Sequence, residues 1–411
     1  MNIIKKIYCR TFQTVFKMAI PFMPYRKPKV SHSVKDIPEI MLKNNCKNVL
    51  IVTDKGIRSH GLLNSLEEAL NEAGLKHSVY DGTVPNPTTE NISEATSIYR
   101  ENECDCLIGF GGGSSMDCAK VVGACIAKPN QSFNKMKGIL KIHKKLPLLI
   151  AIPTTAGTGS ETTLAAIVTD AETRHKYCIN DFPLIPRYAI LDPQITASLP
   201  THITSTTGMD ALTHAVEAYI GNSTTFGTRK NATDAVKLIF KNLDKAYYNG
   251  KDLKARKEML KASFYAGCAF TKSYVGYVHA VAHSLGGEYN VPHGLANAIL
   301  LPMVLEEYGA SIYKKLYKLA LAAELCDKDT PYEEAAATFI QAIKDMKKRY
   351  GIGDTVPALK EEDIPKLAKY ADKEANPLYP VPVLMNAKEL EKFYYMLLET
   401  ETDSENDSEN K

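Results

Sequence analysis

Between residues 47 and 152 the chain alternates short apolar runs with helical stretches, and this alternation constrains the fold more than any other sequence feature. The run 48–53 predicts a buried strand, and residues 62–73 predict a helix that ends before Gly74, the usual residue at a helix C-terminus. The pattern repeats with strands expected at 77–80, 106–110 and 147–152 and a helix at 89–103. Strand–helix–strand units of this length predict a parallel sheet with helices on both faces.

The pattern changes near residues 191–200, after which the expected elements are long helices. They are expected at 209–219, 229–247, 252–271, 274–289, 298–308, 311–326, 331–350 and 387–398. A chain of 411 residues usually forms two domains. We therefore predict an α/β nucleotide-binding domain over residues 31–198, followed by an all-α metal-binding and catalytic domain over residues 199–398.

The two ends of the chain differ in charge. Residues 1–30 carry seven basic side chains and no acid, interleaved with apolar residues, which predicts a basic amphipathic helix. We expect it to pack on the protein's own body, and the alternative is contact with a membrane surface. No run reaches the roughly 20 apolar residues of a membrane span, and the segment does not resemble a signal peptide. Residues 399–411 are acidic and are expected to form a disordered tail.

Composition excludes few functions. The net charge of +3, without a motif of interleaved basic and aromatic residues, does not favour nucleic-acid binding. The nine cysteines are odd in number and scattered, so they form neither a zinc pattern nor a disulfide framework. We therefore expect reduced thiols and a cytoplasmic protein.

A glycine-rich stretch follows the strand expected at 106–110. Its residues are Gly111, Gly112, Gly113, Ser114, Ser115, Met116 and Asp117. Ser114 and Asp117 match a variant capping box, but capping needs only one glycine. Three glycines at the start of a helix let a diphosphate approach the backbone N–H groups, which favours a ligand-binding loop. The stretch is not the GxGxxG fingerprint, so alone it is weak evidence for a dinucleotide fold.

Two further features point to a cofactor. Residues 153–161 (PTTAGTGSE) follow a predicted strand and are dense in hydroxyl groups and glycine. Asp54 ends the first strand, where a carboxylate accepts hydrogen bonds from a ribose diol and repels a 2′-phosphate. This favours NAD over NADP, although Asp54 is equally placed to cap a helix.

Histidines and one acid recur at helical spacing in the second half of the chain. His279 and His283 are four residues apart, as are Asp210 and His214, and His293 lies in a Pro-His-Gly turn. Two helices that each present such a pair can build a metal site. The spacing leaves open which of the four histidines are ligands.

Four segments together resemble the iron-containing (group III) alcohol dehydrogenase family. They are GGGSSMDCAK (111–120), PTTAGTGSE (153–161), GMDALTHAVEAY (208–219) and GYVHAVAHSLGGEYNVPHG (276–294). The similarity extends from about residue 30 to residue 398, and the last segment is a specific signature. The resemblance implies the dehydroquinate synthase-like fold, with an N-terminal nucleotide-binding α/β domain, an all-α C-terminal domain and a cleft between them.

The resemblance also assigns roles to individual residues. It implies that Asp210, His214, His279 and His293 are the metal ligands, and that His283 is an unligated catalytic histidine. The implied cofactor residues are Asp54, Asn86, Gly112, Gly113, Ser114, Thr154, Thr155 and Thr158, with Lys176 as a further position.

The activity implied is that of an NAD(P)-dependent oxidoreductase acting on short primary alcohols, diols or their aldehydes, assembled as a homodimer or larger. The metal would activate the substrate oxygen for hydride transfer, and His283 would relay a proton. Fe(II) is expected, and one Asp with three His also suits Zn(II) or another divalent ion. The alternatives are a glycerol or polyol dehydrogenase, a hydroxyacid–oxoacid transhydrogenase, or a non-catalytic protein that binds metal and nucleotide.

Overall fold

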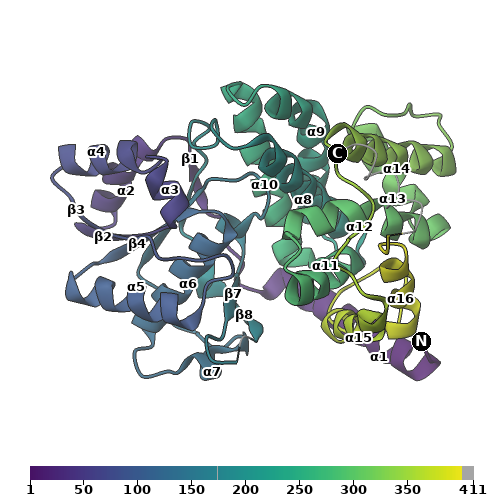
Figure 1. Cartoon of the computed structure of the whole chain (residues 1–411), viewed down its shortest axis with the longest axis horizontal. Coiled ribbons are helices and arrows are strands. Elements are labelled where there is room, and N and C mark those ends of the chain that lie inside the picture. Colours follow the sequence, from purple (N-terminus) through teal and green to yellow (C-terminus); the bar gives the residue numbers. More distant parts are fainter. Residues whose placement is uncertain (174, 400–411) are drawn as a thin grey trace. The chain divides into compact units, whose positions relative to one another are not determined.

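The computed structural model describes residues 1–173 and 175–399, and these form two compact units (Figure 1). The α/β unit comprises Pro24–Thr204 and Asn242–Thr271, and the helical unit comprises Met1–Met23, Ser205–Lys241 and the described part of Lys272–Lys411. Both units are therefore discontinuous in sequence. The domain boundary expected near residue 198 stays a prediction. All of the expected acidic tail after Glu399 lies outside the described residues.

The α/β unit is built on a six-stranded sheet in the order β1–β9–β6–β4–β2–β3, and every neighbouring pair is parallel. The strands are β1 Lys29–Ser31, β2 Asn48–Val52, β3 Lys76–Tyr80, β4 Cys106–Gly111, β6 Leu148–Pro153 and β9 Tyr188–Ile190. This confirms the predicted parallel sheet. A smaller sheet has the order β5–β8–β7, with strands β5 Gly138–Ile139, β7 Ala165–Thr169 and β8 Lys176–Asn180.

The helices of the α/β unit cover both faces of the larger sheet (Figure 1). They are α2 Ile37–Lys43, α3 Lys55–Ser59, α4 Asn64–Glu72, α5 Thr89–Glu101, α6 Gly113–Ala127 and α7 Phe133–Met136, with α10 Leu253–Ser273 as far as residue 271. Short 3-10 turns lie at Val34–Asp36, Ser160–Thr162 and Phe182–Leu184.

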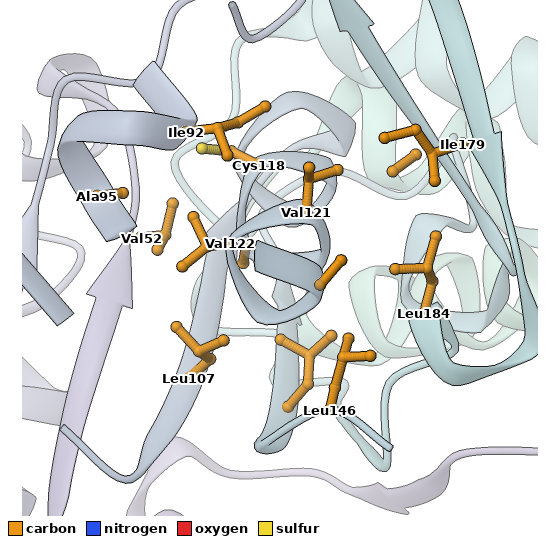
Figure 2. Packing of buried hydrophobic residues seen from close by; sticks show 14 of the residues in the cluster. Val52, Ile92, Ala95, Leu107, Cys118, Val121, Val122, Leu146, Ile179 and Leu184 are labelled. Atoms are coloured by element: carbon orange, nitrogen blue, oxygen red, sulfur yellow. The ribbon is translucent and has the colours of Figure 1, made fainter. Parts of the chain in front are cut away.

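Each face of the larger sheet has its own apolar core. Figure 2 shows the core formed with α5 and α6, where Val121 and Val122 belong to one buried cluster with Leu107 of β4. On the other face Val49 and Ile51 of β2 pack in a second cluster that includes side chains of α2 and α4. Strands buried on both faces read as continuous apolar runs, which is why β2 and β4 could be recognised from sequence.

The helical unit contains most of the remaining helices. They are α1 Ile3–Ala19, α8 Thr201–Ile220, α9 Phe226–Tyr248, α11 Tyr277–Tyr289, α12 His293–Tyr308, α13 Tyr313–Ala322, α14 Tyr332–Arg349, α15 Ile364–Ala375 and α16 Ala387–Tyr395, with 3-10 turns at Ile20–Phe22, Gly309–Ser311 and Glu361–Asp363. The sequence did not predict α15, and α12 begins five residues earlier than expected. The helical character of the C-terminal region is confirmed.

The basic N-terminal segment forms α1, which contacts the helical unit through polar side chains. Arg10 donates hydrogen bonds to the carbonyl oxygens of Val381 and Pro382, each at 2.7 Å, and Gln13 donates one to Tyr379 at 2.7 Å. Phe16 adds an edge-to-face ring contact with Tyr274 at 5.1 Å, so the helix contacts the protein's own body through mainly polar side chains. No described helix is long and apolar enough to cross a bilayer.

A buried lysine joins α6 to the loop that follows β6. Lys120 is fully buried, and its ammonium group donates to Ser160 Oγ at 2.7 Å, Thr163 Oγ1 at 2.9 Å and the carbonyl oxygen of Ala165 at 2.7 Å. It also pairs with Asp117 at 3.3 Å. Burial lowers the pKa of Lys120, and Asp117 opposes this shift. A buried cation with this many partners fixes the position of the loop relative to α6.

We expect Lys120→Met to lower the free energy of unfolding by about 3–5 kcal/mol, because it leaves the partly buried Asp117 carboxylate and the acceptor oxygens of Ser160, Thr163 and Ala165 without their cation. Urea denaturation in the absence of metal and nucleotide measures this change. Lys144→Met, at an exposed position of the same unit, is the control and should change stability little. Equal stability of the two variants would contradict the structural role of Lys120.

Candidate functional site

Two groups of predicted functional residues form, one in each unit. In the α/β unit, β6, β4 and β2 are neighbours and parallel, so their carboxyl ends meet at one edge of the sheet. Strand β3 lies on one side of β2, and β4, the next strand of this sheet along the chain, lies on the other side. The direction in which successive strands are placed in the sheet therefore reverses between β2 and β4. Such a switch point is where open α/β sheets bind ligands.

Gly111 and Gly112 at this edge serve different purposes. Gly111 has φ +157°, and a Cβ there would lie 2.6 Å from Ser115 Cβ, so packing alone requires glycine. A Cβ on Gly112 would meet only Thr155 Oγ1, at 4.0 Å. Since packing does not explain Gly112, the open space beside it fits a bound ligand that approaches the backbone.

The predicted capping box at the start of α6 is wrong. The N-cap residue is Gly112, which has no side chain to accept a hydrogen bond, so Ser114 lies inside the first turn. Asp117 instead accepts hydrogen bonds from Ser160 Oγ at 2.7 Å and from the backbone N–H of Ile167 at 3.0 Å. The first turn of α6 thus begins without a side-chain cap, which suits an anion at the helix N-terminus.

Contacts bring most of the predicted cofactor residues together. The backbone N–H of Thr154 donates to the carbonyl oxygen of Gly111 at 3.0 Å, and a Cβ on Gly113 would lie 3.3 Å from Thr158. Asn86, with φ +58°, donates its backbone N–H to Ser114 Oγ at 3.2 Å. The loops after β4 and β6 and the loop at Asn86 therefore form one group.

Asp54 and Lys176 differ from that group. Asp54 caps α3, since its Oδ1 accepts a hydrogen bond from the backbone N–H of Ile57 at 2.9 Å. The capping interpretation of Asp54 is thus observed, while its contact with a ribose stays a prediction. Lys176 begins β8, so it comes from the smaller sheet, and burial lowers the pKa of its ammonium group.

In the helical unit, three helices bring Asp210, His214, His279 and His293 together. Asp210 and His214 lie on α8, His279 on α11, and His293 at the first position of α12. One ligand atom from each of the four lies within 4.8 Å of the others. The arrangement needs close packing of α12 on α8, because a Cβ on Gly294 would lie 2.6 Å from the carbonyl oxygen of Thr206.

The donor atoms of this cluster converge on one point. The side-chain nitrogen of Asn297 lies 2.7 Å from Asp210 Oδ1, 3.2 Å from His279 Nε2 and 3.0 Å from His293 Nε2. An amide N–H₂ carries partial positive charge, so the three acceptor atoms direct their lone pairs to one small region. A carboxylate and two imidazoles aimed in this way, with a ring nitrogen of His214 within 4.8 Å of their donor atoms, are a donor set for a divalent first-row metal.

Glu217 contacts His279 through Nδ1, the ring nitrogen that is not directed at Asn297. His279 Nδ1 lies 2.5 Å from Glu217 Oε2, and the backbone N–H groups of Gly276 and Val278 donate to the same carboxyl group at 2.8 and 2.9 Å. A Cβ on Gly276 would lie 2.7 Å from Glu217 Oε1, so glycine is needed there. With Nδ1 donating to Glu217, Nε2 keeps its lone pair for a metal.

The electrostatics favour the neutral imidazoles of His279 and His293. Removal from water lowers the pKa of His279 well below its ordinary value, and the neighbouring imidazoles lower it further. Removal from water likewise lowers the pKa of His293 to about 4, although Asp210 opposes the shift. Neutral imidazole is the form that binds a metal. Burial raises the pKa of Glu217 to about 8, against the lowering effect of its backbone hydrogen bonds.

His283 adjoins the cluster without belonging to the four converging ligands. Its ring stacks on that of His293 at 5.2 Å, and its side chain is 38% exposed. Nδ1 lies 2.6 Å from Glu374 Oε1, which also accepts a hydrogen bond from the Tyr379 hydroxyl at 2.7 Å. Loss of water lowers the pKa of His283, but Glu374 outweighs this effect and raises it overall.

Sequence reasoning did not identify Glu217, Asn297 or Glu374. A signal existed for Glu217, because Asp210, His214 and Glu217 follow the spacing i, i+4, i+7 of one helix face. Asn297 lies four residues after His293 and shares its face. Glu374 is on α15, which the sequence did not predict, so no local signal connected it with His283.

Comparison with known proteins identifies the family. Residues 30–193 match the family described as "Iron-containing alcohol dehydrogenase", and residues 204–398 match "Fe-containing alcohol dehydrogenase family, C-terminal". The chain belongs to the iron-containing alcohol dehydrogenase family. The resemblance seen in the sequence motifs is thereby confirmed, and the protein is an oxidoreductase of this alcohol dehydrogenase family.

Several members of the iron-containing alcohol dehydrogenase family are similar over most of the chain. A 1,3-propanediol dehydrogenase of Citrobacter freundii is 38% identical over 355 residues, which cover 85% of this chain and 90% of that protein. An NAD-dependent methanol dehydrogenase of Bacillus methanolicus is 36% identical over 82% of this chain and 89% of its own length. The solved structure of a 1,3-propanediol oxidoreductase superposes with a TM-score of 0.87 at 34% identity, covering 91% of this chain and 98% of that one.

We expect Glu217→Ala to weaken divalent metal binding by roughly 10–100-fold, because His279 loses the partner that fixes its orientation. Competition with a chromogenic chelator, using Zn(II) and the purified protein, measures this affinity. Glu217→Gln keeps an acceptor oxygen and should lose less. Glu306→Ala, at a half-exposed acid of the same unit, is the control. Unchanged affinity in folded Glu217→Ala would contradict the role.

Proposed function

We propose that this protein is a metal-dependent, NAD(P)-linked alcohol dehydrogenase and aldehyde reductase that acts on short primary alcohols or diols. One observation carries the proposal: ligand atoms of Asp210, His214, His279 and His293 lie within 4.8 Å of one another. The names of the similar proteins, a 1,3-propanediol dehydrogenase and a methanol dehydrogenase, support small alcohols as substrates.

The proposed ion is Fe(II), held by those four residues, and Zn(II) or another divalent ion also suits the donor set. Such an ion would act as a Lewis acid toward the substrate oxygen. The protein's own contribution is orientation: Glu217 fixes His279, and Asn297 contacts Asp210, His279 and His293. These contacts place the donor atoms before an ion arrives.

The proposed cofactor is NAD, bound at the edge of the larger sheet. The start of α6 and the hydroxyl-rich loop after β6 would contact the diphosphate and nicotinamide halves through Asn86, Gly112, Gly113, Ser114, Thr154, Thr155 and Thr158, with Lys176 as an additional contact. Asp54 at the end of β2 favours NAD over NADP, because a carboxylate repels a 2′-phosphate. The NAD dependence of the B. methanolicus relative supports this choice.

His283 is the proposed proton relay. Glu374 orients its ring through Nδ1, which leaves Nε2 for exchange with substrate. The half-exposed side chain gives the proton a route to solvent. We further propose that the protein is cytoplasmic and assembles as a homodimer or larger oligomer.

Reconstitution tests the function directly. Protein purified without oxygen and stripped of metal should be inactive, and Fe(II) or Zn(II) should restore oxidation of NADH by short aldehydes. Absorbance of the reduced nicotinamide follows the reaction, with NADPH in parallel. His214→Ala should lose the restored activity, while His202→Ala, exposed on the same helix, should keep it.

Different failures of this assay have different meanings. Turnover of an alcohol with an oxoacid and without added nucleotide would favour a transhydrogenase, and activity confined to glycerol would favour a polyol dehydrogenase. No reaction with any metal, nucleotide or aldehyde, in folded protein that binds metal, would contradict an enzymatic role.

We expect His283→Ala to keep its metal content while kcat falls by about 10²–10⁴, because the proton relay is lost but the four ligands remain. Elemental analysis and steady-state kinetics on the same preparation measure the two quantities. His202→Ala should match the wild type in both. Loss of metal in the His283 variant would show that His283 is a ligand.

A further inference from the structure

Helix α1 presents an apolar face to solvent. Of the 22 large hydrophobic side chains exposed among the described residues, eight lie within the first 22 positions of the chain. They are Ile3, Ile4, Ile7, Tyr8, Phe12, Val15, Met18 and Phe22, with exposed fractions of 37–89%. Those on the helix recur at intervals of three, four and seven residues, so they line one side of α1. We call them the outer face of α1.

The opposite side of α1 is fixed to the helical unit by polar contacts. Cys9 and Gln13 are buried, and Arg10 and Gln13 donate hydrogen bonds to backbone carbonyl oxygens between residues 377 and 382. Lys5 pairs with Asp372 of α15 at 2.8 Å. Phe16 also makes an edge-to-face ring contact with Tyr274 on this side. Because all these contacts lie opposite the outer face, the outer face is not part of the core of its own unit. Figure 1 shows α1 beside α15.

The charge beside the outer face is positive. No acidic residue occurs before Asp36, and Lys6 and Lys17 are both exposed on α1. Lys17 lies near two further cations of the helical unit, Lys315 and Arg229. Burial, together with the charges of Lys17, Arg10 and Arg229, lowers the pKa of Lys315 to about 8. Glu389 and Asp372 each already pair with a cation at the N-terminal end of the helix.

We propose that the outer face of α1 binds the surface of an anionic phospholipid bilayer. An apolar helix face with aromatic side chains enters the boundary between headgroups and acyl chains, and flanking lysines bind anionic headgroups. The helix is 17 residues, or about 26 Å, long and lies along the surface rather than across the membrane. The positive flanks favour anionic lipid over a second copy of this chain, whose own lysines would meet them.

Vesicle flotation of the full-length protein tests the proposal. The wild type should float with vesicles of phosphatidylcholine and phosphatidylserine and much less with phosphatidylcholine alone. Ile4→Ser/Val15→Ser/Met18→Ser should lower the partition coefficient by roughly tenfold or more, because three apolar anchors are lost. Lys6→Glu/Lys17→Glu should cause a similar loss, and added salt should weaken binding of the wild type.

The control removes exposed apolar side chains elsewhere in the helical unit. Phe226→Ser/Tyr332→Ser/Tyr370→Ser changes three residues that are 48–80% exposed, and it should bind vesicles as the wild type does. Equal flotation of the wild type and the α1 triple variant would overturn the proposal, as would equal binding to neutral and anionic vesicles. An oligomer that the α1 triple variant dissociates, in protein that binds no vesicles, would overturn it in favour of a subunit interface.

Discussion

The helical unit depends on the convergence of four polar side chains in a region that is largely removed from water. A buried carboxylate and several imidazoles are costly unless each polar atom has a partner. Much of this requirement is met by Glu217 beside His279, Asn297 between three of the donors, and Glu374 beside His283. Helices α8, α11 and α12 must pack closely for these contacts to form, which is why glycine occupies positions 276 and 294.

The α/β unit satisfies a comparable requirement at the edge of its sheet. The loop after β6 has little regular structure, yet its position is defined by Lys120, which reaches from α6 to Ser160, Thr163 and Ala165. Asp117, expected to cap α6, belongs to this network instead. The lysine thus connects the glycine-rich start of α6 with the hydroxyl-rich loop, the two segments proposed to bind the cofactor.

Helix α1 reverses the usual amphipathic arrangement. A helix on a globular protein normally turns its apolar stripe inward. Here, hydrogen bonds from Arg10 and Gln13 to backbone carbonyl oxygens fix the inward side, and Phe16 adds one ring contact there, while most of the apolar side chains stay exposed. The sequence established that α1 is amphipathic, but amphipathicity does not specify which side meets the protein. That depends on the carbonyl oxygens of residues 377–382, which accept hydrogen bonds from Arg10 and Gln13.

The sequence by itself determined the parallel sheet and the helical C-terminal region, since periodicity records burial and helix faces directly. The resemblance of its motifs to the family pointed to the four residues that lie together in the candidate metal site. It missed α15, although the buried residues of that helix, Ile364, Leu367, Ala368, Ala371 and Ala375, recur at helical spacing. Tertiary structure alone decided that His283 pairs with Glu374, 91 residues away, and that Asp117 supports a loop rather than a helix end. Such pairings depend on which helices pack together, and local spacing carries no information about partners so distant in the chain.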